Sequence, residues 1–272
     1  QLTLKVQEYG KDHFEKSEPV LGDYLLEEDE ERDIEYVSEF VFTLQFDPHH
    51  TAQGETLVLN ETFEIDNETL TLTTVDIYPS HIRLNFQDHD HNTAWLQSFE
   101  LFLENEKGKR YEGISNGITA TGSPDSPMMA SHMLESSFFS NSKELTLFIT
   151  GVTWLDKDKE KVYLDLKNEK IEYLPQDARL ESIEQIDDSW ILEFSGKKEE
   201  NGGHYQLWGW DYYDEEGKEY HINGTSSVDN MEMPGRFETR FALKNYPYDG
   251  VYLSPIYSRM VNLPEPIKIQ VK

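Results

Sequence analysis

The chain lacks cysteine altogether, so disulfide bonds contribute nothing to its stability. It also lacks long apolar runs: no stretch approaches the ~18 consecutive apolar residues of a membrane-spanning helix. Residues 1–20 contain no apolar core of a signal peptide. Because the sequence begins with Gln1 rather than Met, we expect it to be a fragment of a longer protein, with the leader or anchor outside it.

Basic residues are also scarce. The 272 residues include 24 Lys and Arg against 53 Asp and Glu, which gives a net charge of −29. A surface this acidic repels phosphate backbones and anionic lipids, which argues against nucleic-acid binding and against docking on a membrane surface. It is compatible with a cationic partner, with calcium or with a salty exterior. Apolar residues make up only 37%, but 15 Tyr, 14 Phe and 5 Trp partly offset this deficit with large side chains.

Apolar residues recur with a period of two along most of the chain. Leu70 and Leu72 follow the turn pair Asp66-Asn67, and Ile82, Leu84 and Phe86 continue the pattern in the next segment. Such alternation is typical of half-buried β-strands. Helical periodicity is scarce, and only residues 127–139 could hold a short helix or turn. The sequence therefore predicts an all-β fold.

Several segments of the chain resemble later ones, in the same order. Gly108 and Gly217 sit in similar acidic turns at a distance of 217 − 108 = 109 residues. The similar pairs are 73–86 with 180–196, 99–118 with 205–227, 143–152 with 248–258, and 161–166 with 267–272. Preserved order over the whole length indicates an internal repeat.

The repeat predicts tandem immunoglobulin-like β-sandwich modules, since such sandwiches take ~100 residues each. We expect a first complete module at 55–174 and a second at 175–272. Residues 1–54 are interpreted as the last strands of a preceding module, because LTLKV and EFVFTLQF resemble the blocks near 145 and 162. The alternative is an N-terminal hairpin that joins the first complete module.

Three phrases carry a resemblance to a known family: GISNGITATGSPDS (113–126), FFSNSKELTLFITGV (138–152) and KVYLDL (161–166). With TLVLNETFEIDNETLTLTTVDIYPSHIRL (56–84), they resemble the extracytoplasmic part of membrane-anchored, anti-sigma-factor-like proteins of Gram-positive bacteria, built from domains of unknown function. Ser38 departs from the family pattern, which has Trp there. The resemblance implies a cytoplasmic segment that binds a sigma factor and a single membrane helix, both outside this fragment. It implies no catalytic residues.

Aromatic residues near residue 210 are candidates for ligand binding. Trp208, Trp210, Tyr212 and Tyr213 could stack on a sugar, whose faces pack on aromatic rings. Trp208 and Trp210 lie two apart in a strand and would share one face. Packing in the core of the second module is the alternative for the same residues.

The stretch Asp88–His91 contains four potential metal ligands in a row. In an extended segment His89 and His91 would share one face and the two aspartates the other, so a metal would depend on the two histidines. A solvated loop between strands is the alternative.

Residues 113–117 fit the G-x-S-x-G pattern of a nucleophile elbow, but the residues that follow do not predict the helix which that chemistry requires.

Taken together, these features predict a non-enzymatic, extracytoplasmic sensing, binding or structural module without a cofactor. Its partner would be an unknown surface ligand or protein. A sigma factor and the membrane would be contacted only through the parent's other segments. The alternative is a surface carbohydrate-binding or adhesive protein.

Overall fold

The computed structural model describes residues 2–9, 36–44, 54–114, 128, 130–140, 142–197, 206–230 and 233–272. It divides into two compact units, Gln1–Ala52 and Gln53–Lys272. The described residues form antiparallel strands and two short 3-10 helices, η3 (Phe138–Ser140) and η4 (Lys157–Lys159), without an α-helix. The all-β prediction is confirmed, and none of the described helices is long and apolar enough to cross a membrane.

The first unit contains one pair of described strands, β1 (Leu2–Tyr9) and β2 (Tyr36–Leu44). They run antiparallel as a two-stranded sheet. Both interpretations of residues 1–54, the remnant of a preceding module and the hairpin that joins the first complete module, stay predictions.

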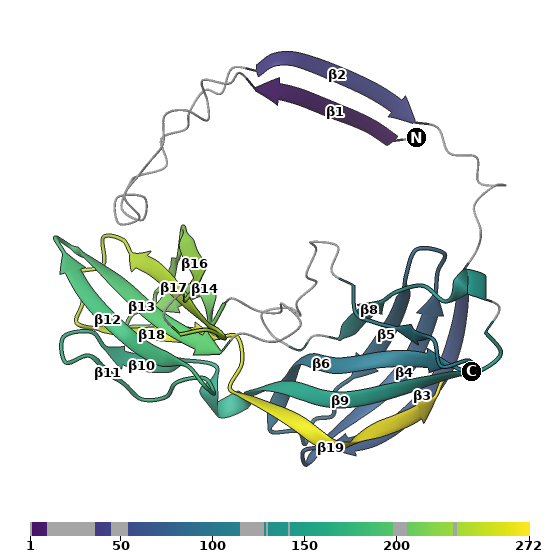
Figure 1. Cartoon of the computed structure of the whole chain (residues 1–272). Coiled ribbons are helices and arrows are strands. Elements are labelled where there is room, and N and C mark those ends of the chain that lie inside the picture. Colours follow the sequence, from purple (N-terminus) through teal and green to yellow (C-terminus); the bar gives the residue numbers. More distant parts are fainter. Residues whose placement is uncertain are drawn as a thin grey trace. The chain divides into compact units, whose positions relative to one another are not determined.

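In the second unit, two four-stranded sheets enclose one apolar core, and we call this pair of sheets the first sandwich (Figure 1). Residues at alternate positions, such as Leu70, Leu72 and Leu147, are fully buried in this core. The β4 sheet has the order β3 (Glu55–Ile65), β4 (Glu68–Ile77), β5 (Ile82–Gln87), β8 (Ser131–Leu134), and the β9 sheet has the order β19 (Arg259–Gln270), β9 (Leu145–Asp156), β6 (Ala94–Asn105), β7 (Arg110–Tyr111).

A four-stranded and a five-stranded sheet enclose the other core, and we call them the second sandwich. In this core the ring centroid of Phe194 lies 5.0 Å from that of Trp208 and 5.9 Å from that of Phe241. The β13 sheet has the order β12 (Arg179–Ile186), β13 (Ser189–Lys197), β17 (Arg236–Leu243), β16 (Thr225–Asp229), and the β18 sheet has the order β11 (Lys170–Ile171), β10 (Val162–Asp165), β18 (Gly250–Pro255), β14 (Trp208–Tyr213), β15 (Glu219–His221).

The strand pairing differs from the expected modules 55–174 and 175–272 at two places. The last strand, β19, pairs with β9 of the first sandwich, while β10 pairs with β18 of the second. Figure 1 shows β19, in yellow, alongside β9. A period-two pattern predicts that a segment is a strand but does not select its neighbour, so the sequence could not assign these strands. The immunoglobulin-like character of the modules stays a prediction.

Arg259, the first residue of β19, joins three carboxylates of the first sandwich. Its guanidinium lies 2.9 Å from Asp66, 3.4 Å from Glu68 and 3.2 Å from Asp156. Glu68 is almost fully buried and also accepts hydrogen bonds from the backbone and hydroxyl of Thr93. Asp66 sits in the β3–β4 turn, where it adopts a φ of 53° as hairpin turns of this kind require. Arg259 therefore ties the start of β19 to this turn.

We expect Arg259→Ala to destabilise the second unit by about 3 kcal/mol, because it leaves the buried Glu68 carboxylate without its cation. Urea unfolding measures this change. Arg110→Ala is the matched control: Arg110 pairs with Glu104 but is 56% exposed, so its loss should cost at most about 0.5 kcal/mol. Equal effects of the two substitutions would contradict the account.

His132 of β8 packs against aromatic residues of the first sandwich. Its ring centroid lies 5.6 Å from that of Phe86 and 5.3 Å from that of Phe99. Its Nε2 atom is enclosed and has no hydrogen-bond partner among the described residues. Burial disfavours the charged imidazolium and lowers the pKa of His132 to about 4.

The first sandwich should accordingly lose stability as the pH falls from about 6.5 to about 4, since only the unfolded state gains the proton of His132 in that range. Above pH 6.5 the contribution is complete. His132→Phe should remove about 3 kcal/mol from the pH dependence of the unfolding free energy. His221→Gln, a substitution at an exposed position, should leave the pH dependence of unfolding unchanged. An equal decrease of this dependence in both variants would refute its assignment to His132.

Candidate functional site

Three tyrosines lie side by side on the outer face of the β18 sheet. The register pairs Tyr163 of β10 with Tyr252 of β18, and Tyr252 with Tyr213 of β14. Their strand neighbours, such as Leu164 and Leu253, are buried in the core, so the tyrosines face away from it. The rings of Tyr163 and Tyr252 are 5.2 Å apart. We call these three residues the tyrosine row.

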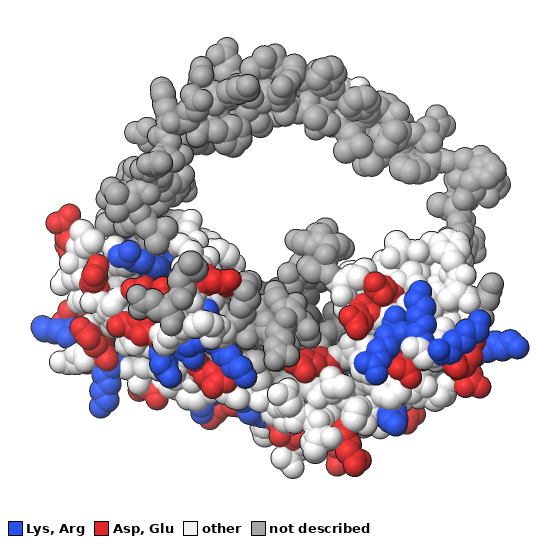
Figure 2. All heavy atoms as spheres, viewed as in Figure 1, with Lys and Arg blue, Asp and Glu red and all other residues white. Residues whose placement is uncertain are grey.

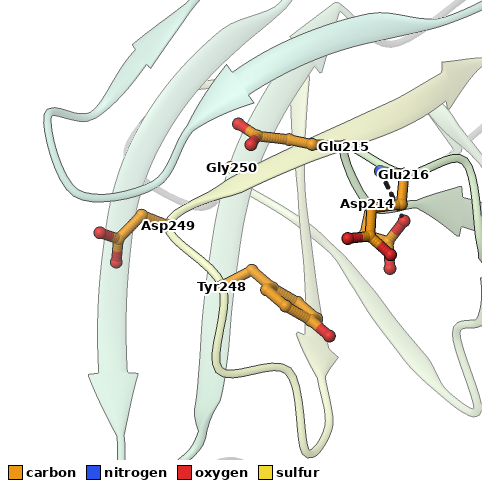
Figure 3. Close-up of a pocket in the computed structure, with 6 residues that line it drawn as sticks. All are labelled: Asp214, Glu215, Glu216, Tyr248, Asp249 and Gly250. Carbon is orange, nitrogen blue, oxygen red and sulfur yellow. Dashed lines mark hydrogen bonds between the residues drawn. The ribbon is translucent and has the colours of Figure 1, made fainter.

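A pocket opens where the β14–β15 turn meets the loop before β18. It is a cavity of about 170 Å³ whose lining includes four carboxylates and one aromatic ring (Figure 3). Tyr248 exposes 47% of its surface there. We call it the acidic pocket, and its lining residues are Asp214, Glu215, Glu216, Tyr248, Asp249 and Gly250.

Asp214 shapes the pocket rather than offering its carboxylate to a ligand. Its Oδ1 atom accepts hydrogen bonds from the backbone N–H groups of Glu216 and Lys218, both at 2.9 Å, and its Oδ2 from the Tyr220 hydroxyl at 3.0 Å. Burial opposes ionisation of Asp214, but these donors outweigh it and lower the pKa of its carboxyl. Asp214 is thus a structural anion, and the carboxylates of Glu215, Glu216 and Asp249 remain for a ligand.

The opposite wall of the pocket is held by tyrosines that pack edge to face. Tyr246 is fully buried and donates a hydrogen bond of 2.6 Å to the carbonyl of Gly250, which closes the loop between them. Its ring lies 5.1 Å from that of Tyr248 and 5.5 Å from that of Tyr212. Burial raises the pKa of Tyr246 and keeps its hydroxyl a donor at neutral pH. The loop that presents Tyr248 is therefore anchored in the core.

The tyrosine row and the acidic pocket meet at Tyr163. Its hydroxyl donates a hydrogen bond of 2.8 Å to Glu215, and this bond, with burial, raises the pKa of Tyr163 to about 12. Gly250 makes the approach possible: a Cβ atom there would overlap the Tyr163 hydroxyl and lie 2.7 Å from a Glu215 oxygen. The two features form one continuous surface, which we take as the candidate site.

The structure separates the four aromatic residues that the sequence grouped as a binding stripe. Trp208 and Tyr212 are 3% and 2% exposed in the core, while Trp210 is 46% exposed and Tyr213 belongs to the tyrosine row. Trp208 and Trp210 do not share a face as expected. The reason is an irregularity in β14: Trp208 pairs with Pro255 and Tyr212 with Leu253, so β14 has extra residues between the two pairs.

The two histidines proposed as metal ligands lie close together in the β5–β6 loop, with ring centroids 5.6 Å apart. His89 Nε2 is 2.9 Å from the hydroxyl of Thr71, and His91 Nε2 is 3.0 Å from that of Thr69. Asp88 is engaged elsewhere, by Asn92 and Lys157. Within the described part of the chain, no group of three His, Cys, Asp or Glu side chains could hold a metal. A metal on the histidine pair stays a prediction.

The charge of the surface is mixed on the face shown in Figure 2, where Lys and Arg side chains lie among the Asp and Glu side chains. The acidic pocket has no basic residue in its lining, although Lys167 lies 3.5 Å from Asp249 at its rim. Both partners of this pair are more than 60% exposed, so it contributes little to stability. A cationic ligand would compete with the exposed Lys167 for Asp249.

The G-x-S-x-G segment extends into residues 115–117, outside the described part of the chain.

Residues 54–176 match the model of a family of unknown function, DUF5643. No curated protein and no solved structure matches the chain. The resemblance to domains of unknown function is thereby confirmed for this segment, and the match itself assigns no activity.

Replacing Glu215 with Gln should bring the pKa of Tyr163 down from about 12 toward the ordinary value near 10, because the negative acceptor of its hydroxyl is lost. NMR titration of tyrosines labelled with ¹³C at Cζ measures it, with Tyr163→Phe identifying the signal. Glu216→Gln makes the same change of charge at the residue next to Glu215 and should leave the pKa of Tyr163 unchanged. An unshifted Tyr163 in Glu215→Gln would show that the two parts of the site are not joined.

Proposed function

We propose that residues 53–272 form a non-enzymatic, extracytoplasmic binding module of a membrane-anchored, anti-sigma-factor-like regulator. The observation that supports a binding role is the tyrosine row, which adjoins an acidic pocket at one end of the same sheet. The link to sigma-factor control rests on the resemblance in residues 56–84 and 113–166. Occupancy of the site would change the arrangement of the region and so the fate of the parent's cytoplasmic segment.

A cationic ligand fits the candidate site best. An ammonium or guanidinium group gains from an aromatic face and from nearby carboxylates. Tyr248 offers such a face beside Glu215, Glu216 and Asp249. The strongly negative net charge would also draw a cation toward the surface from a distance and make its binding sensitive to salt.

The alternative is a carbohydrate-binding or adhesive surface protein, and the tyrosine row favours it. Tyr163 and Tyr252 come from adjacent strands, so their rings could stack on successive sugar units. At Tyr213 a sugar would have to displace Lys161, whose Nζ lies 3.4 Å from the ring centroid. Binding of a cationic ligand and binding of a carbohydrate depend on different residues of the candidate site. Sugar binding depends on the rings of the row and resists salt, whereas cation binding depends on the pocket carboxylates and weakens as salt is added.

We expect the triple variant Glu215→Gln, Glu216→Gln, Asp249→Asn to alter sigma-dependent transcription at least threefold when it is placed in the full-length parent protein, because the site loses its charge. A reporter gene under the sigma factor's promoter measures it. The matched control changes three exposed carboxylates of the same sandwich: Glu172→Gln, Glu184→Gln and Asp188→Asn.

In parallel, calorimetric titration of the chain with a Lys-rich peptide and with N-acetylglucosamine oligomers tells the two ligand classes apart. Peptide binding that the triple variant abolishes supports the cationic ligand. Oligosaccharide binding that Tyr252→Ala abolishes supports the alternative. Transcription that is unchanged both by the triple variant and by deletion of residues 53–272 would refute the regulatory role.

A further inference from the structure

The two sandwiches share a turn that marks them as structural repeats. Asn105 ends β6 and Asp214 directly follows β14. The Oδ1 atom of each accepts hydrogen bonds from the backbone N–H groups two and four residues later, at 3.0 and 3.0 Å and at 2.9 and 2.9 Å. Gly108 and Gly217 close these turns with φ angles of 75° and 83°. The spacing is the same for both pairs: 214 − 105 = 109 and 217 − 108 = 109.

This correspondence extends to the neighbouring strands. The β9 sheet has the order β19-β9-β6-β7, and the β18 sheet contains the order β10-β18-β14-β15. Along the chain, however, β10 follows β9 and β19 follows β18. The DUF5643 match, 54–176, likewise runs through β10 without reaching β19. The first repeat therefore places its last two strands, β10 and β11, in a sheet of the second, and the second repeat places its last strand, β19, in a sheet of the first.

The two crossing segments are hydrogen-bonded to each other at Ser258, which is fully buried. The backbone N–H of Ser258 donates to the carbonyl of Trp154 at 2.7 Å, and the Ser258 hydroxyl accepts from the N–H of Asp156 at 2.9 Å. The carbonyl of Ser258 accepts from the N–H of Gln176 at 2.9 Å and from the hydroxyl of Tyr173 at 2.7 Å. Ser258 thus connects the end of β9 with the segment that enters the β13 sheet.

The links between exchanged strands are short. Residues 256–258 separate β18 from β19, and residues 157–161 separate β9 from β10. If the second sandwich opens, β10 separates from β18. This separation displaces the end of β9, which precedes β10, and the start of β19, where Arg259 holds the β3–β4 turn. Links of three and five residues leave little slack to absorb such a displacement.

We propose that this reciprocal strand exchange couples the two sandwiches, so that they open together and a ligand bound to the second stabilises the first. The coupling does not depend on what the ligand is. It also makes the tyrosine row composite: Tyr163 comes from the first repeat, and Tyr213 and Tyr252 come from the second. Residues of both repeats are needed to present one surface.

Native-state hydrogen exchange on the whole chain at low denaturant tests the coupling. Phe194→Leu leaves a small cavity in the second core, and Phe194 lies on β13, outside the two sheets that exchange strands. Coupled sandwiches predict the same loss of protection, about tenfold, for the slowest amides of β6 and β9 in the first sandwich and of β13 and β18 in the second. Leu72→Ala in the first core should lower protection in both sandwiches in the same way.

Loss of protection confined to the sandwich that carries the substitution would overturn the proposal. If Phe194→Leu does not fold, Ile222→Val removes a single methylene from the same core and gives the same comparison at smaller amplitude. Val228→Ala is the matched control, since Val228 is 47% exposed on β16. It should change protection in neither sandwich, and a change in both would show that the readout is not specific to the cores.

Discussion

The exchange of β10 and β19 is the constraint on which the rest of the second unit depends. The β9 sheet is completed by the last strand of the chain, and the β18 sheet by a strand that follows β9 directly. Buried Ser258 and the ion pairs of Arg259 hold the two crossings. Without this exchange Tyr163 would not stand beside Tyr252, and the acidic pocket would lose the hydroxyl that binds Glu215.

The excess of negative charge is handled in two different ways. In the first sandwich, Asp66, Glu68 and Asp156 converge on one arginine, whose positive charge lies beside the nearly buried Glu68 and offsets part of the local negative charge. Around the acidic pocket, by contrast, the lining contains carboxylates without a basic residue. Carboxylates that are paired contribute to stability, whereas those left exposed beside an aromatic ring are available to a ligand.

Period-two alternation was enough to predict the strands and the Asp66-Asn67 turn, because burial on one sheet face imposes that period. The sequence repeat also indicated which turns correspond. Neither signal could show that β10 and β19 change sheets, since the choice of neighbouring strand depends on tertiary packing.

The sequence predicted only part of the candidate site. It named Tyr213, but Trp208 and Tyr212, which it also named, are buried in the core. The irregularity in β14 that exposes Trp210 cannot be recognised from the alternation of apolar residues. Tyr163 and Tyr252 lie 89 residues apart (252 − 163) and meet only through the exchanged strand.

One measurement tests the central claim most directly: urea unfolding of the chain labelled with 5-fluorotryptophan, followed by ¹⁹F NMR. Trp154 reports on the core of the first sandwich and Trp208 on that of the second. Sandwiches coupled by exchanged strands predict that both signals lose their native shift at the same urea concentration. Two separate midpoints, with one tryptophan native while the other is unfolded, would contradict the account.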